Sequence, residues 1–208
     1  MNGGPPRQLV VLLHGLGDTG EGLIGLAHPF RPLFPDAEFI APDAPWPHDM
    51  LPFGRQWFSL RRMDPAFILD GVQKAAPILD AFLDQALSER GLTDKDLILI
   101  GFSQGTMMSL YVGPRRASAC AAIIGFSGML VGPELMADAV ASRPPVLLVH
   151  GADDEVLTAD ASRVAAKVLE ANGFQTELVI CPNLPHSIDN LGVESAARFL
   201  QAVFKQAN

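Results

Sequence analysis

The chain has 208 residues, of which 49% are hydrophobic and 18% charged, so it is long and apolar enough for one domain with a sizeable core. Its formal net charge of -8, without a lysine- or arginine-rich run, argues against nucleic acid or an anionic membrane surface as a partner. No apolar run approaches the roughly 20 residues of a membrane span.

The cysteines and the start of the chain indicate a compartment. Cys120 and Cys181 lie in apolar stretches without a metal or redox spacing, which favours buried free thiols in a reducing cytosol. Residues 1–8 contain no apolar signal-peptide core. We therefore expect a cytoplasmic protein that forms a single domain over residues 1–208.

Short apolar runs alternate along the chain with stretches of helical periodicity. We expect strands over residues 8–13, 38–41, 96–100, 119–124, 145–150 and 176–181. We expect helices over residues 68–86, 106–112, 159–172 and 189–204. This alternation predicts an α/β fold with a mostly parallel central sheet and helices on both faces.

Three segments carry more specific expectations. Pro77 lies inside the first long helix, so we expect a kink or a break there, and Gly91 is placed as the C-terminal cap of that helix. The segment 42–65 has no periodicity, and its prolines rule out regular structure at its start. The inward face of the last helix is expected to consist of Leu191, Ala196, Phe199, Leu200 and Val203.

The motif with the clearest chemical meaning is Gly101-Phe102-Ser103-Gln104-Gly105, which lies between a predicted strand and a predicted buried helix. Strand, G-x-S-x-G and helix in this order are the context of a nucleophile elbow. The glycines leave room for a sharp turn with a strained backbone at the serine. The free N–H groups at the helix start point to the same place. Ser103 is therefore the expected nucleophile.

A serine hydroxyl needs an adjacent base, and the base needs an orienting acid. His186 follows the last predicted strand, which gives the order Ser…Asp…His of the α/β-hydrolases. His14 and His150 end strands just before glycine, and we interpret both as structural residues of those turns. The acid is expected in the loop after His150, where spacing alone does not separate Asp153 from Asp154.

The tetrahedral intermediate of acyl transfer also needs donors for its oxyanion. We expect one to be the backbone N–H of Gln104, directly after the nucleophile, and the other the N–H of Leu16 in the Gly-rich loop after the first strand. In a parallel sheet, ligands bind beyond the carboxyl ends of the strands. The loops expected to meet there are 14–18, 101–105, 151–158 and 182–187.

The segment 42–65 is rich in large apolar side chains although it is too proline-rich for sheet or helix. A long loop of this kind is usually functional, and it leaves the end of the sheet where ligands bind. We expect an apolar acyl group of the substrate to lie along it, in contact with Phe53, Trp57 and Met63. An exposed apolar patch of this kind can equally serve a homodimer.

Together these motifs resemble the phospholipase/carboxylesterase family, which includes the bacterial carboxylesterases and the acyl-protein thioesterases. The resemblance extends from Leu9 to Phe204 and rests on His14-Gly15-Leu16-Gly17-Asp18, Gly54-Arg55-Gln56-Trp57-Phe58, Gly101-Phe102-Ser103-Gln104-Gly105, Ser127-Gly128, His150-Gly151-x-x-Asp154 and His186. The family pattern H-G-x-x-D falls on Asp154, so the resemblance implies Asp154 as the acid. Glu155 and Thr158 stand where the family usually or often has proline. The resemblance implies a small α/β-hydrolase fold without a cap domain, and neither a cofactor nor a metal.

These observations predict a serine carboxylesterase that hydrolyses small-molecule esters with short to medium apolar acyl chains, through Ser103, His186 and Asp154 and an acyl-enzyme. Acyl-protein thioesterase or lysophospholipase activity with the same triad is an alternative. A non-catalytic module that only binds a small ligand is an alternative of another class, because a fold alone does not imply a function. The presence of a serine, a histidine, an acid and both elbow glycines argues against such a module.

Overall fold

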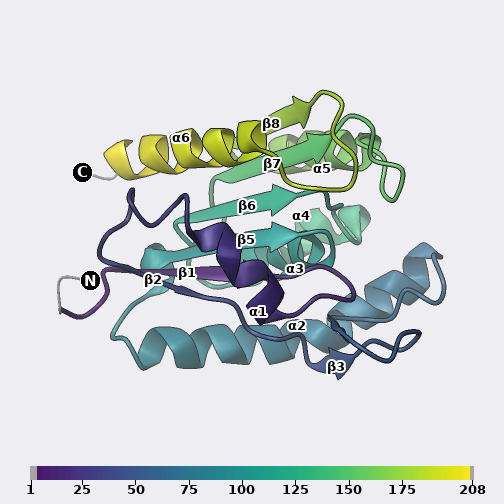
Figure 1. Cartoon of the computed structure of the whole chain (residues 1–208), viewed down its shortest axis with the longest axis horizontal. Coiled ribbons are helices and arrows are strands. Elements are labelled where there is room, and N and C mark those ends of the chain that lie inside the picture. Colours follow the sequence, from purple (N-terminus) through teal and green to yellow (C-terminus); the bar gives the residue numbers. More distant parts are fainter. Residues whose placement is uncertain (1–3, 207–208) are drawn as a thin grey trace.

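Six strands form one sheet through the middle of the molecule, in a computed structural model that describes residues 4–206 (Figure 1). They are β1 (Gln8–Leu13), β2 (Ala37–Ile40), β5 (Leu97–Phe102), β6 (Ala122–Phe126), β7 (Val146–Gly151) and β8 (Thr176–Cys181). Their order is β2-β1-β5-β6-β7-β8, and every neighbouring pair is parallel. The predicted parallel α/β sheet is confirmed, and its carboxyl edge collects the loops that carry the candidate site residues.

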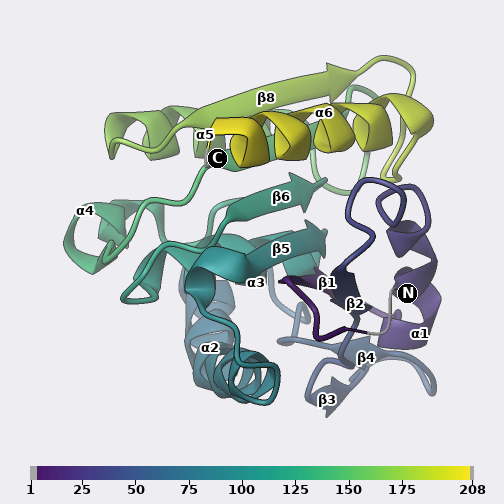
Figure 2. The ribbon, with the colours of Figure 1, turned by 90° about the vertical axis from the view of Figure 1, so that its left-hand side faces the viewer.

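Helices cover both faces of this sheet (Figure 2). The α-helices are α1 (Gly20–Leu23), α2 (Pro65–Ser88), α3 (Gln104–Val112), α4 (Met136–Ala139), α5 (Asp160–Ala171) and α6 (Asn190–Gln206). Short 3-10 turns are η1 (Ile24–Ala27), η2 (Asp94–Asp96), η3 (Gly113–Arg115) and η4 (Pro133–Leu135). Helices α2, α3 and α5 pack on one face, and α1 and α6 pack on the other.

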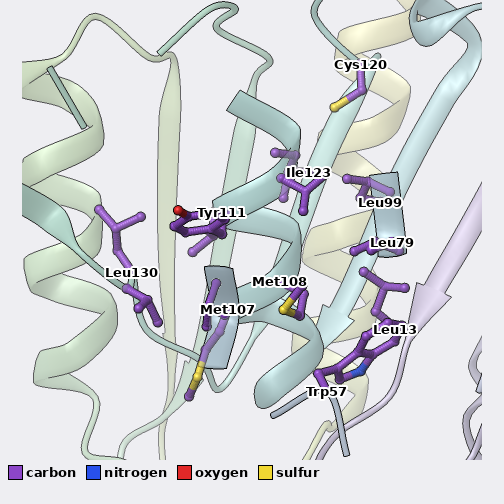
Figure 3. Close-up of a cluster of buried hydrophobic side chains, with 14 of the residues drawn as sticks. Leu13, Trp57, Leu79, Leu99, Met107, Met108, Tyr111, Cys120, Ile123 and Leu130 are labelled. Carbon is purple, nitrogen blue, oxygen red and sulfur yellow. The ribbon is translucent and has the colours of Figure 1, made fainter. Parts of the chain in front are cut away.

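The alternation of side chains along each strand supplies two separate cores. In β1, Leu9 and Val11 enter the core under α2, α3 and α5, while Val10 and Leu12 enter the core under α1 and α6. Figure 3 shows part of the first core, in which Trp57 lies close to the β1 residue Leu13. Because both faces are covered, the strands have continuous apolar sequences rather than alternating ones.

Helix α2 runs without a break through Pro77, so of the expected kink or break the break is wrong. A proline inside a helix costs about 3 kcal/mol. Seven buried apolar residues of α2 offset this cost, since each buried large side chain is worth about 1.5–3 kcal/mol. Asp64 caps the start of the helix at Pro65, because its carboxylate accepts the Phe67 N–H at 3.0 Å. Gly91 follows the end of the helix and has a φ of 65°.

The segment 42–65 contains a short antiparallel pair, β3 (Trp46–Pro47) and β4 (Arg55–Gln56), where no regular structure was expected. Pro47 is tolerated because each strand of the pair is only two residues long. The next residue continues the pairing, since the His48 N–H donates to Gly54 O at 3.0 Å. The Arg55 guanidinium holds the residues before β3 in place by donating to Ala44 O and Pro45 O at 2.7 and 2.8 Å. The segment is therefore a hairpin with residues 48–54 as its tip.

The last helix, α6, buries less of its expected inward face than the periodicity suggests. Ala196, Phe199 and Leu200 are buried, and Val203 packs partly against them. Leu191 is 39% exposed, which corrects its assignment to the core. The first turn of α6 lies next to Asp189, whose carboxylate accepts the Gly192 N–H at 2.8 Å, so a capping contact rather than burial organises this end.

Candidate active site

The elbow serine occupies a sharp turn between β5 and α3. Ser103 has φ 51° and ψ -112°, a backbone conformation that non-glycine residues rarely adopt. A Cβ on Gly101 would lie 2.4 Å from the backbone carbon of Gly105, and a Cβ on Gly105 would lie 1.8 Å from Leu13 O. Only glycine allows the strand and helix to approach this closely, so both glycines are required to present Ser103.

The first Gly-rich loop lies directly against the elbow. A Cβ on Gly15 would lie 3.4 Å from Ser103 Cβ, so the two loops touch. The loop is anchored to the hairpin, because the Gly17 N–H donates to Arg55 O at 2.8 Å and the Arg55 N–H donates to Asp18 O at 3.0 Å. Leu16 lies between Gly15, which packs against Ser103, and the anchored Gly17. Its backbone is therefore held beside the serine.

The buried side chains of His14 and Trp57 hold the first Gly-rich loop in place. His14 Nε2 accepts the Ala44 N–H at 2.9 Å, and its Nδ1 lies 2.7 Å from Gly15 O, so Nδ1 carries the proton. Burial lowers the pKa of His14, although the Gly15 carbonyl acts in the opposite direction. Trp57 Nε1 donates to His14 O at 3.0 Å, and its ring packs 5.8 Å from the His14 ring. His14 is therefore neutral and structural.

The side chain of Gln104 ties the elbow to the segment after the hairpin. Its Oε1 accepts the Trp57 N–H at 3.1 Å, and its Nε2 donates to Phe58 O at 2.8 Å. Gln104 is also the first residue of α3, so its backbone N–H has no acceptor within the helix. The residue expected as an oxyanion donor is thus immobilised by its own side chain.

Asp154 and His186 form a hydrogen-bonded pair. His186 Nδ1 donates to Asp154 Oδ2 at 2.6 Å, while the Val156 and Leu157 N–H groups donate to Asp154 Oδ1, both at 2.9 Å. Asp154 is buried, whereas Asp153 is exposed, so the structure brings Asp154 and not its neighbour to the histidine. Spacing in the sequence left this choice open.

The Asp154 side chain is fully buried, yet it stays ionised. Burial alone raises the pKa of the Asp154 carboxyl, but the hydrogen bonds from the Leu157 N–H, His186 and the Val156 N–H outweigh burial and lower it. Because the Asp154 carboxylate accepts a hydrogen bond from Nδ1 of His186, Nδ1 is the protonated nitrogen of that ring. Nε2 is then left free to accept a proton.

The two loops that carry this pair are joined by backbone contacts and lie beside the elbow. The Ala152 N–H donates to Cys181 O at 2.8 Å, and the Asp153 N–H donates to Leu184 O at 3.0 Å. A Cβ on Gly151 would lie 2.2 Å from Leu184 O, so glycine is needed for this approach. The His186 ring lies 5.0 Å from the Phe102 ring, next to Ser103.

The three residues expected to contact the substrate have different placements. Phe53 at the hairpin tip is 67% exposed, and Met63 just before α2 is 64% exposed. Trp57 is only 2% exposed and belongs to the core under α2, so it supports the first loop instead of lining an open surface. The neighbouring residues Gln56 and Phe58 do not show in the sequence that Trp57 is buried. Its burial is decided by its contacts with His14 and Gln104.

Two polar residues near the site, His150 and Ser127, were not assigned to the site from the sequence. His150 is buried beside Asp154, and Ser127 has a positive φ of 48° with a hydroxyl that has no partner among the described residues. Residues 4–206 contain no group of three or more His, Cys, Asp or Glu side chains arranged to hold a metal ion. None of the helices in this part of the chain combines the length and apolar character needed to cross a membrane.

Comparisons with known proteins identify the family of the chain. A family model described as phospholipase/carboxylesterase matches residues 1–204. The chain is 28% identical to esterase YpfH of Escherichia coli, over 95% of this chain and 83% of that protein. It is 27% identical to acyl-protein thioesterase 1 of Aspergillus fumigatus, over 93% and 87%. The solved structure of esterase PE8 is 42% identical, with a TM-score of 0.93, and the match covers 96% of this chain and 94% of that one. The chain therefore belongs to the phospholipase/carboxylesterase family.

Proposed function

We propose that the chain is a serine carboxylesterase in which Ser103, His186 and Asp154 form the catalytic triad. Carboxylic ester hydrolysis as a class follows from its family. The observation that carries the triad is the 2.6 Å contact of His186 Nδ1 with Asp154 Oδ2, beside a serine held in an elbow. A carboxylate that binds Nδ1 orients the imidazole as a base and stabilises the imidazolium that forms.

In the proposed reaction, His186 Nε2 takes the proton of the Ser103 hydroxyl as Oγ attacks the ester carbonyl carbon. The backbone N–H groups of Leu16 and Gln104 donate to the resulting oxyanion. The ester C–O bond then breaks, and His186 gives the proton to the leaving alcohol. Water attacks the acyl-enzyme by the same route, which releases the carboxylic acid and restores Ser103. Asp154 stays ionised throughout.

Three substitutions test the triad. Ser103→Ala is expected to lower kcat by on the order of 10⁶, and Asp154→Asn by roughly 10⁴ because the amide no longer fixes the tautomer of His186. Asp153→Asn is the matched control, since its exposed carboxylate precedes Asp154 directly. It is expected to leave kcat unchanged. The measurement is ester turnover by variants whose circular dichroism shows a native fold. Substantial turnover by Ser103→Ala, or the reverse ranking of the two aspartates, would contradict the triad.

The acyl group of the substrate lies along the hairpin segment in this proposal. The hairpin is anchored to the loop that carries Leu16, and its tip exposes Phe53. A hollow of about 240 Å³ lies between this segment and α2, and its wall combines Trp46, Phe58 and Phe67 with Gln56, Ser59, Asp70, Gly71 and Lys74. Each buried methylene adds about 0.8 kcal/mol, or nearly fourfold in affinity. The elements formed by residues 4–206 include no cap domain over the site, so we expect an optimum at short to medium chains.

A series of acyl esters from acetyl to dodecanoyl tests this part of the proposal. The wild-type kcat/KM is expected to rise with chain length and then level off or fall. Phe53→Ala and Met63→Ala are expected to lose the preference for longer chains while keeping activity on acetyl esters. Val164→Ala is the control, because Val164 is an exposed apolar residue on α5. A flat profile in the wild type, or an equal loss on acetyl and longer esters in both variants, would remove this segment from the acyl site.

Thioester hydrolysis with the same triad is the second candidate, because the chain matches an acyl-protein thioesterase over most of its length. An oxyester and a thioester with the same acyl group separate the two activities. A carboxylesterase is expected to show the higher kcat/KM on the oxyester. The opposite ranking would favour the thioesterase.

A further inference from the structure

A second histidine lies against the proposed triad acid. His150, near the end of β7, is fully buried, and its Nε2 lies 3.1 Å from Asp154 Oδ2. This is the oxygen that also accepts the His186 Nδ1–H at 2.6 Å. Two imidazole nitrogens are therefore within 3.1 Å of one carboxylate oxygen.

The contacts of His150 determine where its proton lies. Nε2 is 2.7 Å from Leu157 O, a carbonyl that can only accept, so Nε2 carries the proton and donates it. Nδ1 is 2.7 Å from Ser162 Oγ, and the same hydroxyl lies 3.3 Å from Gly128 O, so Ser162 links the ring to the Gly128 carbonyl. The ring is thus fixed at both nitrogens, with its N–H edge beside the carboxylate.

His150 acts on the acid through two contacts. Its Nε2–H holds Leu157 O, and the Leu157 N–H in turn donates to Asp154 Oδ1 at 2.9 Å. The positive end of the same N–H dipole lies near Oδ2. We propose that His150 is a positioning residue, which holds the Asp154 carboxylate at the orientation that His186 needs. This inference rests on the proposed function, and it gives His150 a role beyond the structure of its turn.

The proposal separates kcat from KM. His150 is buried, with Asp154, Leu157 and Ser162 as its polar neighbours, so it touches no substrate. Its loss is expected to change the chemical step and to leave KM within about twofold. Replacing the outer-shell partners of metal ligands typically costs about 10–100-fold in activity, and we expect a loss of the same order for a residue that positions the Asp154 carboxylate. A purely structural histidine would lower the amount of folded enzyme but not kcat per active site.

Two replacements of His150 form a matched pair. His150→Gln keeps an N–H donor near the position of Nε2, and it is expected to retain kcat within about threefold. His150→Leu removes the donor and keeps an apolar volume, and it is expected to lower kcat by about 10–100-fold. Ser162→Ala removes the support of Nδ1 without touching the donor. Its expected loss is about three- to tenfold in kcat, so the proposal stays testable if His150→Leu does not fold.

The decisive readout is a double-mutant cycle with Asp154→Asn. If His150 acts through Asp154, then His150→Leu, or Ser162→Ala, is expected to lose its effect on kcat in the Asp154→Asn background. Equal fold losses in both backgrounds, or equal kcat for His150→Gln and His150→Leu, would overturn the proposal. Near wild-type kcat for Asp154→Asn alone would instead refute the triad, so the two failures are distinguishable.

Discussion

Trp57→Ala is expected to destabilise the fold rather than to change acyl preference. Trp57 is 2% exposed, and truncation of a buried tryptophan costs about 3–5 kcal/mol. The change also removes the Nε1 donor to His14 O, a hydrogen bond worth about 1 kcal/mol. A loss of about 4 kcal/mol is a large share of a typical stability of about 5–15 kcal/mol. For a domain of this size, it lowers Tm by about 8–16 °C.

Phe53→Ala is the matched control for this prediction. Phe53 belongs to the same segment but is 67% exposed, so its truncation is expected to change the free energy of unfolding by less than about 0.5 kcal/mol. Urea unfolding followed by far-ultraviolet circular dichroism measures both variants without relying on tryptophan fluorescence. If Trp57→Ala were as stable as the wild type and altered only the acyl preference, Trp57 would face the substrate and its placement in the core would be refuted.

Three other variants, two of them paired with a control variant, test how the backbone and the buried polar groups hold the site. Gly105→Ala is expected to cost about 3 kcal/mol or more in unfolding free energy, because its Cβ would lie 1.8 Å from Leu13 O, whereas Gly25→Ala, with no atom within 4 Å, is expected to be neutral. Since the folded-state pKa of His14 is lowered, the unfolded state takes up the proton first, so stability should fall as the pH drops below about 6.5. His14→Gln should flatten this slope in pH-dependent urea titrations, and His28→Gln at an exposed histidine should not. Ser127→Ala removes a buried hydroxyl without a partner among the described residues. The free energy of unfolding is expected to stay unchanged or to rise slightly. A loss above about 1 kcal/mol would show that the hydroxyl is hydrogen-bonded.

The sheet and the elbow could be predicted because local sequence determines them. Continuous apolar runs are typical of strands buried on both faces, and the two cores on either side of β1 and β5 explain that pattern. The glycines at 101 and 105 were expected for lack of space, and the structure shows it, because a Cβ at these positions would meet backbone atoms at 2.4 and 1.8 Å. Both inferences need only neighbours along the chain and the fixed geometry of a parallel sheet.

Features decided by contacts between distant segments could not be predicted. The periodicity of α2 shows its inward face, but it does not show that the packing of this face outweighs the cost of Pro77. Trp57 resembles the exposed apolar residues of its segment until His14 and Gln104 bind its side chain and backbone. His150 and Asp154 are only four residues apart, but their spacing does not show that the Asp154 carboxylate turns back onto the imidazole of His150.

Covalent labelling with a fluorophosphonate tests the central claim most directly, because the probe needs an activated serine but no knowledge of the substrate. The account predicts one adduct per chain, located by mass spectrometry at Ser103 within the tryptic peptide of residues 96–115. It also predicts that labelling is nearly lost in His186→Gln, where the base is absent. No adduct on the folded wild-type protein, an adduct on another serine, or undiminished labelling of His186→Gln would contradict the account.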